Sequence, residues 1–562
     1  MSFGAEKEFS LTQGQERMTI KVFTAKKIIT MNPSWPDGTA VAVRDGRILE
    51  VGSMESLGPW LARDEHEIVD FGDAIILPGL IDPHLHPVMA AVLLPMHFVT
   101  ALEWDLPWQT VPACPDQESY RQKIAELEAA MEGDEPFFTW GYHASWHGDI
   151  SRELLDEISS TRPMVVWHRS FHEVYLNSAM LELLEITLDS VGTRQQIDFE
   201  RGHFYEVGLG YAIQKLNRFI MSDEWIRTGL SRLKQIVHLG GHTTVGDLAV
   251  GLFDYELERA LSVSILDQPE VPFRVLGVPH AATTSRLKGG HKEVVAHINE
   301  LQGSDTSRIR HGKHIKVFTD GAFFSELAML QAPGYLDGHH GEWLMTPEEF
   351  EVTVREYWQA EFAIHVHCTG DLGLELAIDT LENMQREKPR FNHGYTIEHF
   401  GFSNPEQVAR LGKLGAMISA NVYYLFELSE QYATQSVGFE RAYTMSRLGT
   451  SVAHDIPVAL HSDFPMAPAT PLKNAWIACS RQNAAGNIAG IEESVSVVDA
   501  LRAITIDAAT VLGMQDEVGS IRAGKIADFT VIDRDPIEDG EDALREANVI
   551  ATVFEGELFM LG

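Results

Sequence analysis

The chain has 562 residues, 44% hydrophobic and 22% charged, which is enough for a large globular domain with an accessory domain or a long insertion. Its 81 acidic residues outnumber its 44 basic residues, and the formal net charge of -37 argues against binding to nucleic acid or to an anionic membrane surface. The three cysteines, Cys114, Cys368 and Cys479, have no CxxC spacing, so neither a disulfide framework nor a thiolate zinc site is indicated. Because residues 1–22 lack the apolar core of a signal peptide and no run is long enough to span a membrane, we expect a cytoplasmic protein.

The first predicted elements are short strands in residues 18–76. The run AVAVRDGRILEVG has β-type patterning, and Asp45-Gly46 within it is typical of a hairpin turn. Residues 515–562, at the far end of the chain, show similar β-branched alternation with a glycine-bearing turn at Glu555-Gly556. We therefore predict one small β-sandwich domain assembled from residues 18–76 and 515–562.

Residues 77–514 alternate apolar strand-like runs with amphipathic segments of helix length, which is the pattern of βα units around a parallel sheet. Eight such runs occur, at residues 74–86, 242–250, 272–280, 314–322, 362–370, 395–400, 416–424 and 456–464. Since eight parallel strands close a barrel, we predict an α/β fold with a (β/α)8 TIM barrel. Only the first connection is far longer than a normal loop, which predicts an inserted subdomain over residues 100–225.

Ionisable side chains gather where these predicted strands end. In LPGLIDPHLHP, one residue separates His84 from His86, so an extended strand would point both imidazoles to one face, where they can reach one metal ion. Other runs carry comparable residues near their ends: Lys316, His367, His399 and Asp463. Any one of them alone would be an ordinary core residue or helix cap, but a barrel places all of its strand ends on one rim, where active sites lie. The whole set therefore indicates an active site.

These residues and the segments around them resemble the amidohydrolase superfamily, and within it amidohydrolase family 3, the YtcJ-like hydrolases that include N-substituted formamide deformylases. The matching motifs extend through nearly the whole chain: LPGLIDPHLH at 77–86, the segment 139–181 with PMVV and NSAML, IKVFTDGA at 315–322, VHCTGD at 366–371, IEHF at 397–400, HSDFP at 461–465 and VGSIRAGKIADFTVID at 518–533.

The resemblance implies a metal centre with six ligand residues: His84, His86, Lys316, His367, His399 and Asp463. The first two histidines would bind one divalent metal and the next two a second, with Lys316 bridging both ions as a carbamate derived from CO2. Imidazole and carboxylate ligands suit Zn2+, although manganese, cobalt and iron accept similar ligands. If Lys316 is instead a buried lysine paired with Asp320 or another acid, the site would hold one ion.

The resemblance also implies roles in the reaction. A metal-activated hydroxide would attack the substrate carbonyl, while Asp463 accepts a proton from the attacking water and passes it to the leaving amine. His172 matches the pocket histidine of the family and is expected to bind the carbonyl oxygen or the substrate, with packing in the subdomain as the alternative. Further residues considered as substrate contacts are Glu206, His365, His461 and Asp320.

We therefore expect a metal-dependent amidohydrolase that cleaves a non-peptide C–N bond of a small-molecule substrate, an N-acyl or N-formyl amide. The first alternative is a hydrolytic deaminase of a heterocyclic amine, although such deaminases generally use one ion and lack the bridging lysine. The second is a non-catalytic scaffold barrel, which is disfavoured because scaffold barrels usually lose their ligands first. For assembly we consider a homodimer.

Overall fold

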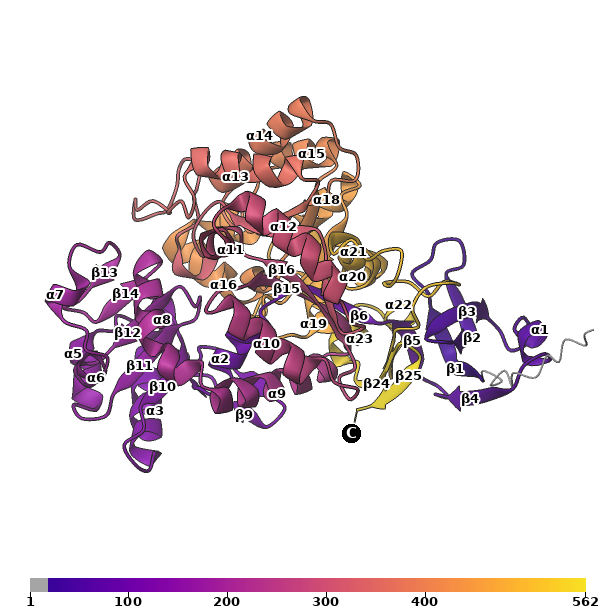
Figure 1. Ribbon diagram of the computed structural model, residues 1–562, viewed down its shortest axis with the longest axis horizontal. Helices are drawn as coiled ribbons and strands as arrows, with labels where there is room; N and C mark the ends of the chain where they lie inside the picture. Colours follow the sequence, from indigo (N-terminus) through magenta and orange to yellow (C-terminus); the bar gives the residue numbers. More distant parts are fainter. Residues whose placement is uncertain (1–18, 562) are drawn as a thin grey trace, which may run out of the picture.

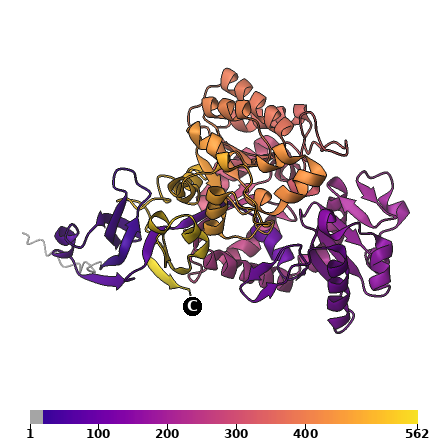
Figure 2. The ribbon, with the colours of Figure 1, turned by 180° about the vertical axis from the view of Figure 1, so that it is seen from behind.

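The computed structural model describes residues 19–561. Met18 at the start of the first predicted strand, Gly562 at the end of the predicted terminal domain and residues 1–17 lie outside the described residues. Three regions lie in a row in Figure 1: a sheet built by both ends of the described chain, a middle region of strands and helices, and an inserted region at the opposite end, an order that Figure 2 shows from behind. No helix within residues 19–561 is long and apolar enough to cross a membrane.

An eight-stranded sheet combines the two ends of the described chain, in the order β25-β24-β23-β5-β1-β2-β3 with β4 also paired to β1. Its strands are β1 (Ile20–Ile29), β2 (Asp37–Arg44), β3 (Arg47–Gly52), β4 (His66–Asp70), β5 (Ile75–Pro78), β23 (Phe529–Ile532), β24 (Val549–Phe554) and β25 (Glu557–Met560), and the short helix α1 (Gly58–Leu61) follows β3. β5 joins the two halves because it pairs with β1 on one side and with β23 on the other. The predicted turns Asp45-Gly46 and Glu555-Gly556 have positive φ at both residues, as tight hairpin turns require.

The middle region contains a strand within each of the eight predicted runs. They are β6 (Leu80–Leu85), β15 (His242–Val250), β16 (Arg274–Pro279), β18 (His314–Phe318), β19 (Ala363–Cys368), β20 (Tyr395–His399), β21 (Met417–Ala420) and β22 (Val458–Leu460), with the short β17 (Ile309–His311) just before β18. All neighbouring strands pair in parallel, in the orders β17-β16-β15-β6 and β18-β19-β20-β21-β22.

Backbone contacts join these two sheets at both edges. At one edge, a bridge pairs His280, which follows β16, with Lys316 on β18. At the other, the amide nitrogen of Asp463 donates to the carbonyl oxygen of His84 at 2.9 Å, and the amide nitrogen of His86 donates to the carbonyl oxygen of Phe464 at 2.9 Å. The contacts therefore trace a ring of eight parallel strands, in which the end of β6 and the residues just beyond β22 hold two neighbouring strands together.

Helices connect the strands of this ring, and further helices follow its last strand, β22. They are α2 (Pro87–Leu93), α9 (Asp223–Leu239), α10 (Tyr255–Leu266), α11 (Ala281–Lys288), α12 (His291–Leu301), α13 (Pro347–Gln359), α14 (Asp371–Glu387), α15 (Pro405–Leu414), α16 (Tyr423–Gln431), α17 (Phe439–Tyr443), α18 (Leu448–Ala453), α19 (Pro471–Ser480), α20 (Val497–Ala503) and α21 (Ile506–Val511), and α22 (Pro536–Asp539) and α23 (Asp542–Glu546) lie between β23 and β24. Local sequence explains where such helices start: α13 begins with a Thr346–Glu349 capping box and Pro347 in its first turn. α13, α14 and α15 lie side by side in Figure 1.

Between β6 and β15 the chain builds a six-stranded sheet, in the order β13-β14-β12-β11-β10-β7. Its elements are β7 (His97–Phe98), β10 (Phe137–Tyr142), β11 (Met164–His168), β12 (Glu173–Leu176), β13 (Ile197–Asp198) and β14 (His203–Tyr205), with the hairpin β8 (Trp104–Leu106) and β9 (Gln109–Val111) and the helices α3 (Gln117–Ala130), α4 (Ala144–His147), α5 (Arg152–Ile158), α6 (Ser178–Leu183), α7 (Leu188–Val191) and α8 (Val207–Ile220). Trp104 is buried in the hydrophobic core, and Trp108 and Trp146 pack against that core. The tryptophans of this region are therefore packing residues.

Candidate metal centre and its cavity

The strand ends bring the predicted ligand residues together. His84 Nε2 lies 3.4 Å and His86 Nε2 lies 3.0 Å from Oδ1 of Asp463, while His399 Nδ1 lies 3.7 Å from Oδ2 of the same carboxylate. The ring of His367 is next to that of His399, with 4.4 Å between the ring centroids. Side chains from β6, β19, β20 and the segment after β22 therefore meet at one end of the ring.

Unusual backbone conformations help to place these side chains. His399, Phe400 and Asp463 have φ values of 71°, 48° and 55°, in the left-handed region that residues other than glycine seldom adopt. Adjacent residues of a regular strand point to opposite faces, yet Glu398 and His399 both contact side chains of the cluster. The left-handed turn at His399 explains how two consecutive residues reach the same centre.

Several atoms in this cluster are buried without a hydrogen-bond partner in the described part of the chain. They are His84 Nε2, His86 Nδ1, Lys316 Nζ, His367 Nε2, His399 Nδ1 and His461 Nε2. Buried polar atoms normally have partners, so a concentration of free nitrogen atoms needs a physical reason. Ligand atoms of His84, His399 and His461 lie within 4.8 Å of one another, and so do those of His84, His86 and Asp463. This donor set of imidazoles and a carboxylate fits a divalent metal ion.

Glu398 is the central residue of this cluster that sequence reasoning missed. His84 Nδ1 donates to Glu398 Oε2 at 2.7 Å and His365 Nδ1 donates to Glu398 Oε1 at 2.6 Å. Burial alone would raise the pKa of Glu398, but the hydrogen bond from His365 and the charge of Lys316 bring the pKa down to about 2. The carboxylate therefore fixes the His84 ring so that Nε2 faces the centre. The motif IEHF was the signal available in the sequence, but regular strand alternation would have pointed Glu398 away from His399.

Lys316 has the properties of an unpaired buried lysine. It is 1% exposed, and burial lowers its pKa to about 8 even though Glu398 and Asp463 act in the opposite direction. The predicted alternative was a pair with Asp320 or another acid, but Lys316 Nζ has no hydrogen-bond partner within residues 19–561. The Asp320 carboxylate instead accepts hydrogen bonds from the backbone amides of Met329, Thr369 and Gly370, so it shapes the loop after β18.

A cavity of about 890 Å3 opens onto the cluster. All six predicted ligand residues line it, as do His172 and Glu206, and much of the remaining wall is apolar, with Phe171, Phe253, Phe318, Leu344 and Met345 among its residues. An apolar cavity with a few converging polar groups is the usual form of a small-molecule site. The size and lining of this one fit an organic substrate much larger than a formyl group.

His172 and Glu206 form a pair on the wall contributed by the inserted region. His172 Nδ1 lies 3.0 Å from Glu206 Oε2. Burial alone would lower the pKa of His172, but the charge and the hydrogen bond of Glu206 raise it above the usual value. The pair therefore favours the protonated form of an imidazole that lines the cavity.

The other three candidate substrate contacts do not line the cavity. His365 lies deeper in the ring, where it donates to Glu398 and accepts a hydrogen bond from His314 Nδ1 at 2.9 Å. His461 Nδ1 lies 2.7 Å from Ser419 Oγ, and its Nε2 belongs to the group of candidate metal ligands. The Asp320 carboxylate binds backbone amides around the loop after β18, as described above. A role for these three residues in substrate contact therefore stays a prediction that the lining of this cavity does not support.

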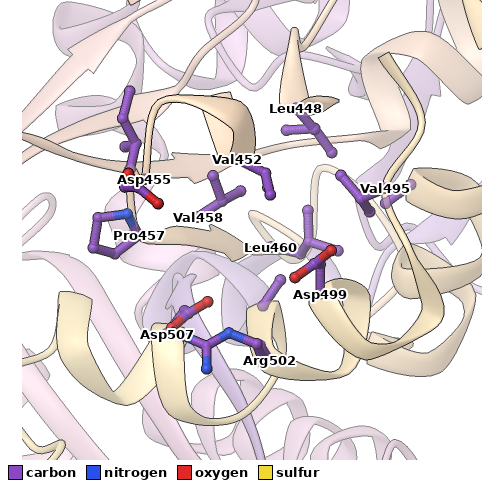
Figure 3. Close-up of a pocket in the computed structure, with 13 residues that line it drawn as sticks. Leu448, Val452, Asp455, Pro457, Val458, Leu460, Val495, Asp499, Arg502 and Asp507 are labelled. Atoms are coloured by element: carbon purple, nitrogen blue, oxygen red, sulfur yellow. Dashed lines mark hydrogen bonds and ion pairs between the residues drawn. The ribbon is translucent and has the colours of Figure 1, made fainter. Parts of the chain in front are cut away.

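A second cavity, of about 280 Å3, is drawn in Figure 3. Leu448, Val452, Val458 and Leu460 form apolar parts of its lining, and its charged residues include Arg502 and Asp507, which pair with each other at 2.6 Å. Its lining contains no histidine. The larger cavity is therefore the one whose side chains can bind a metal and act on a substrate.

A ring of parallel strands with imidazoles and carboxylates at one mouth defines the class of α/β metal-dependent hydrolases. Comparison with known proteins makes the assignment specific: residues 67–559 match the model of the amidohydrolase family, and the chain belongs to that family. It is accordingly a hydrolase that acts on carbon–nitrogen bonds.

The relatives share most of their length with this chain. The N-substituted formamide deformylase of Arthrobacter pascens is 26% identical over 545 residues, covering 92% of this chain and 94% of that protein. Protein LONG AFTER FAR-RED 3 of Arabidopsis thaliana is 24% identical over 553 residues, covering 94% and 90%. An uncharacterized metal-dependent hydrolase from Pyrococcus horikoshii, whose structure is solved, has a TM-score of 0.70 at 20% identity and covers 93% of this chain and 99% of its own, which shows a shared fold.

Proposed function

We propose that the chain hydrolyses the non-peptide C–N bond of a small N-acyl or N-formyl amide. The observation that carries this proposal is the convergence of His84, His86, His399 and Asp463 at the mouth of a cavity that fits an organic substrate. The similarity to a formamide deformylase supports the choice of amide. We interpret the ring of strands as the (β/α)8 barrel, residues 77–514, with residues 100–225 inserted and residues 18–76 and 515–562 forming a separate β-sandwich domain.

The residues that would hold metal divide into two sets. We assign His84, His86 and Asp463 to one ion and His367 and His399 to a second, and we propose zinc. Lys316 lines the same cavity as both sets, and its lowered pKa favours the neutral amine that can add CO2 and become an anionic bridge. When bound, the ions supply an activated water molecule and polarise the substrate carbonyl.

Asp463 is proposed as the proton shuttle. Its carboxylate lines the cavity and lies beside His84 and His86, close to where the attacking water must be. In the forward reaction it would accept a proton from that water and then give the proton to the leaving nitrogen, so that the product departs as a neutral amine. His172, on the cavity wall from the inserted region, would donate a hydrogen bond to the carbonyl oxygen of the substrate and stabilise the charge that develops there.

A second candidate function is hydrolytic deamination of a heterocyclic amine. The specific observation in its favour is the group of His84, His399 and His461, three imidazoles that could hold a single ion without Lys316. In this case the attacked carbon belongs to the heterocycle and the leaving group is ammonia.

One experiment separates the two functions. The protein, loaded with zinc, is analysed for bound metal per chain and is incubated with N-formyl amines, N-acyl amino acids, cyclic imides and aminopurines. We expect two ions per chain and release of amine from an N-formyl or N-acyl amide. One ion per chain with ammonia released only from an aminopurine would replace the amidase proposal with the deaminase.

A further inference from the structure

Glu206 occupies a backbone conformation that normally requires glycine. Its φ and ψ are 44° and -114°, and it stands immediately before α8. Residues other than glycine keep such a conformation only where the surrounding structure imposes it, and such residues concentrate at functional sites. Here the amide nitrogen of Glu206 donates to the carbonyl oxygen of His172 at 3.0 Å, and the next amide, of Val207, donates to Gln196 Oε1 at 2.9 Å.

The side chain of Glu206 is directed to His172 alone. In the described residues its only ion pair is the 3.0 Å contact of Oε2 with His172 Nδ1, and its carboxylate is 4% exposed. The other oxygen, Oε1, is buried without a hydrogen-bond partner. A carboxylate that served only to cross-link the inserted region would use both oxygens, as Glu173 does with His168 and His203. The geometry thus favours a role exerted through the imidazole.

The imidazole of His172 is held at one nitrogen and free at the other. Nδ1 faces Glu206, whereas no hydrogen bond to Nε2 occurs within residues 19–561, and the ring is 26% exposed where it lines the cavity. Two further carboxylates, Glu173 on β12 and Asp463 after β22, also raise the pKa of His172. The charge of His172 in turn lowers the pKa of His168 and of His367.

We propose that Glu206 is a positioning residue for His172: it holds Nδ1–H, so that Nε2–H of the charged ring faces the cavity and donates to the carbonyl oxygen of the amide. A carboxylate that accepts from Nδ1–H stabilises the protonated ring, in which Nε2–H is also a donor, and a donor aimed at the developing oxyanion lowers the barrier. This inference rests on the proposed amide hydrolysis. No proton leaves the ring in this role.

The test is a double-mutant cycle with Glu206→Ala, Glu206→Gln, His172→Asn and the double variant His172→Asn/Glu206→Ala, assayed on whichever N-formyl or N-acyl amide the wild type hydrolyses. We expect Glu206→Ala to lower kcat by roughly 10- to 100-fold with a much smaller change in KM. Glu206→Gln keeps a hydrogen-bond acceptor but loses the charge, so its kcat should fall less than that of Glu206→Ala. The alkaline limb of its kcat/KM profile should move to lower pH. In the His172→Asn background, removal of Glu206 should have no further effect on kcat.

Glu342→Gln is the matched control because Glu342 is a nearby carboxylate that bonds to Gln196 and not to an imidazole. It should leave kcat and the pH profile unchanged. If Glu206→Ala does not fold, the cycle is run with Glu206→Gln. Additive effects of the two single variants, or a Glu206→Gln enzyme with wild-type kcat and pH profile, would overturn the inference.

A second measurement separates failure of this inference from failure of the proposed function. In protein labelled with 13C-histidine, the His172 resonance is assigned by its loss in His172→Asn and titrated without substrate. We expect its pKa to fall in Glu206→Gln and to stay unchanged in Glu342→Gln. An unchanged His172 pKa in Glu206→Gln refutes the pairing, whereas a wild type that hydrolyses no amide refutes only the substrate proposal.

Discussion

The rim of the strand ring and the wall from the inserted region place their polar side chains by different means. On the rim, His84, Lys316 and His367 belong to strands paired in parallel with their neighbours, and left-handed backbone at His399 and Asp463 completes the placement. On the wall, Phe171 and Glu206 have positive φ, and His172 lies between β11 and β12 rather than on a strand. The difference teaches that the candidate metal centre is held mainly by the strand ends, whereas the proposed substrate contacts His172 and Glu206 lie on connecting segments, which tolerate change more readily.

The largest expected effect follows from Asp463→Asn at the rim. An amide cannot accept the proton of the attacking water, so kcat should fall by about 1,000-fold or more. Bound metal should stay near the wild-type amount because the histidines remain and the asparagine amide oxygen can take the ligand position of the carboxylate. Amine release and metal analysis of the same sample test this expectation. Asp455→Asn, in the second cavity of Figure 3, is the control and should keep full activity. Near-normal turnover by Asp463→Asn would contradict the assigned shuttle.

Lys316→Met tests whether the rim holds two ions. Methionine fills a similar volume but cannot form a carbamate, so we expect bound metal to fall from two ions to one per chain and kcat to fall by roughly 100-fold. Lys473→Met is the matched control because Lys473 is half-buried, stacks on Tyr423 and Phe426, and does not line the cavity. An unchanged two-ion content in Lys316→Met would show that the lysine is not a ligand.

Glu398→Gln tests whether Glu398 orients the histidines of the candidate metal centre. Loss of the charge that fixes His84 and His365 should weaken metal affinity by about 10- to 100-fold, as is typical for residues that orient metal ligands. The affinity is measured by competition with a chelator. Thr396→Val, two residues earlier on β20 and equally buried, preserves shape and should leave the affinity unchanged. Equal affinities in the two variants would show that Glu398 does not orient the ligands.

The smallest effect is expected at the apolar wall, from Phe253→Ala. Loss of apolar contact weakens binding of substrate and transition state alike, so KM should rise by roughly 3- to 10-fold with kcat nearly constant. Steady-state kinetics decide this point. The exposed Phe439, which is outside the cavity lining, is the control position for the same substitution. A fall in kcat with unchanged KM would remove the distinction between wall and rim.

Sequence reasoning could locate the strands and the side chains at their ends because both follow from alternation and from the topology of parallel sheets. The runs containing His84, His367 and His399 needed only the rule that neighbouring strand ends lie on one rim. Glu398 could not be found in this way, since the left-handed backbone at His399 overrides the alternation that would separate the two residues. Likewise, the His172–Glu206 pair joins two connecting segments at one end of the paired strands β12 and β14. The alternation of residues within a single segment cannot predict such a contact.

Because of the backbone hydrogen bond between Asp463 and His84, the proposed catalytic residue reaches its position only when the ring of strands is complete. The same residue that is proposed to move protons supplies, through its amide nitrogen, a bond that fastens the last strand of the ring to the first. A nascent chain that has not yet reached β22 lacks both that fastener and the carboxylate beside the histidines. We therefore expect hydrolytic activity only in a chain that has completed β22 and the closure of the ring.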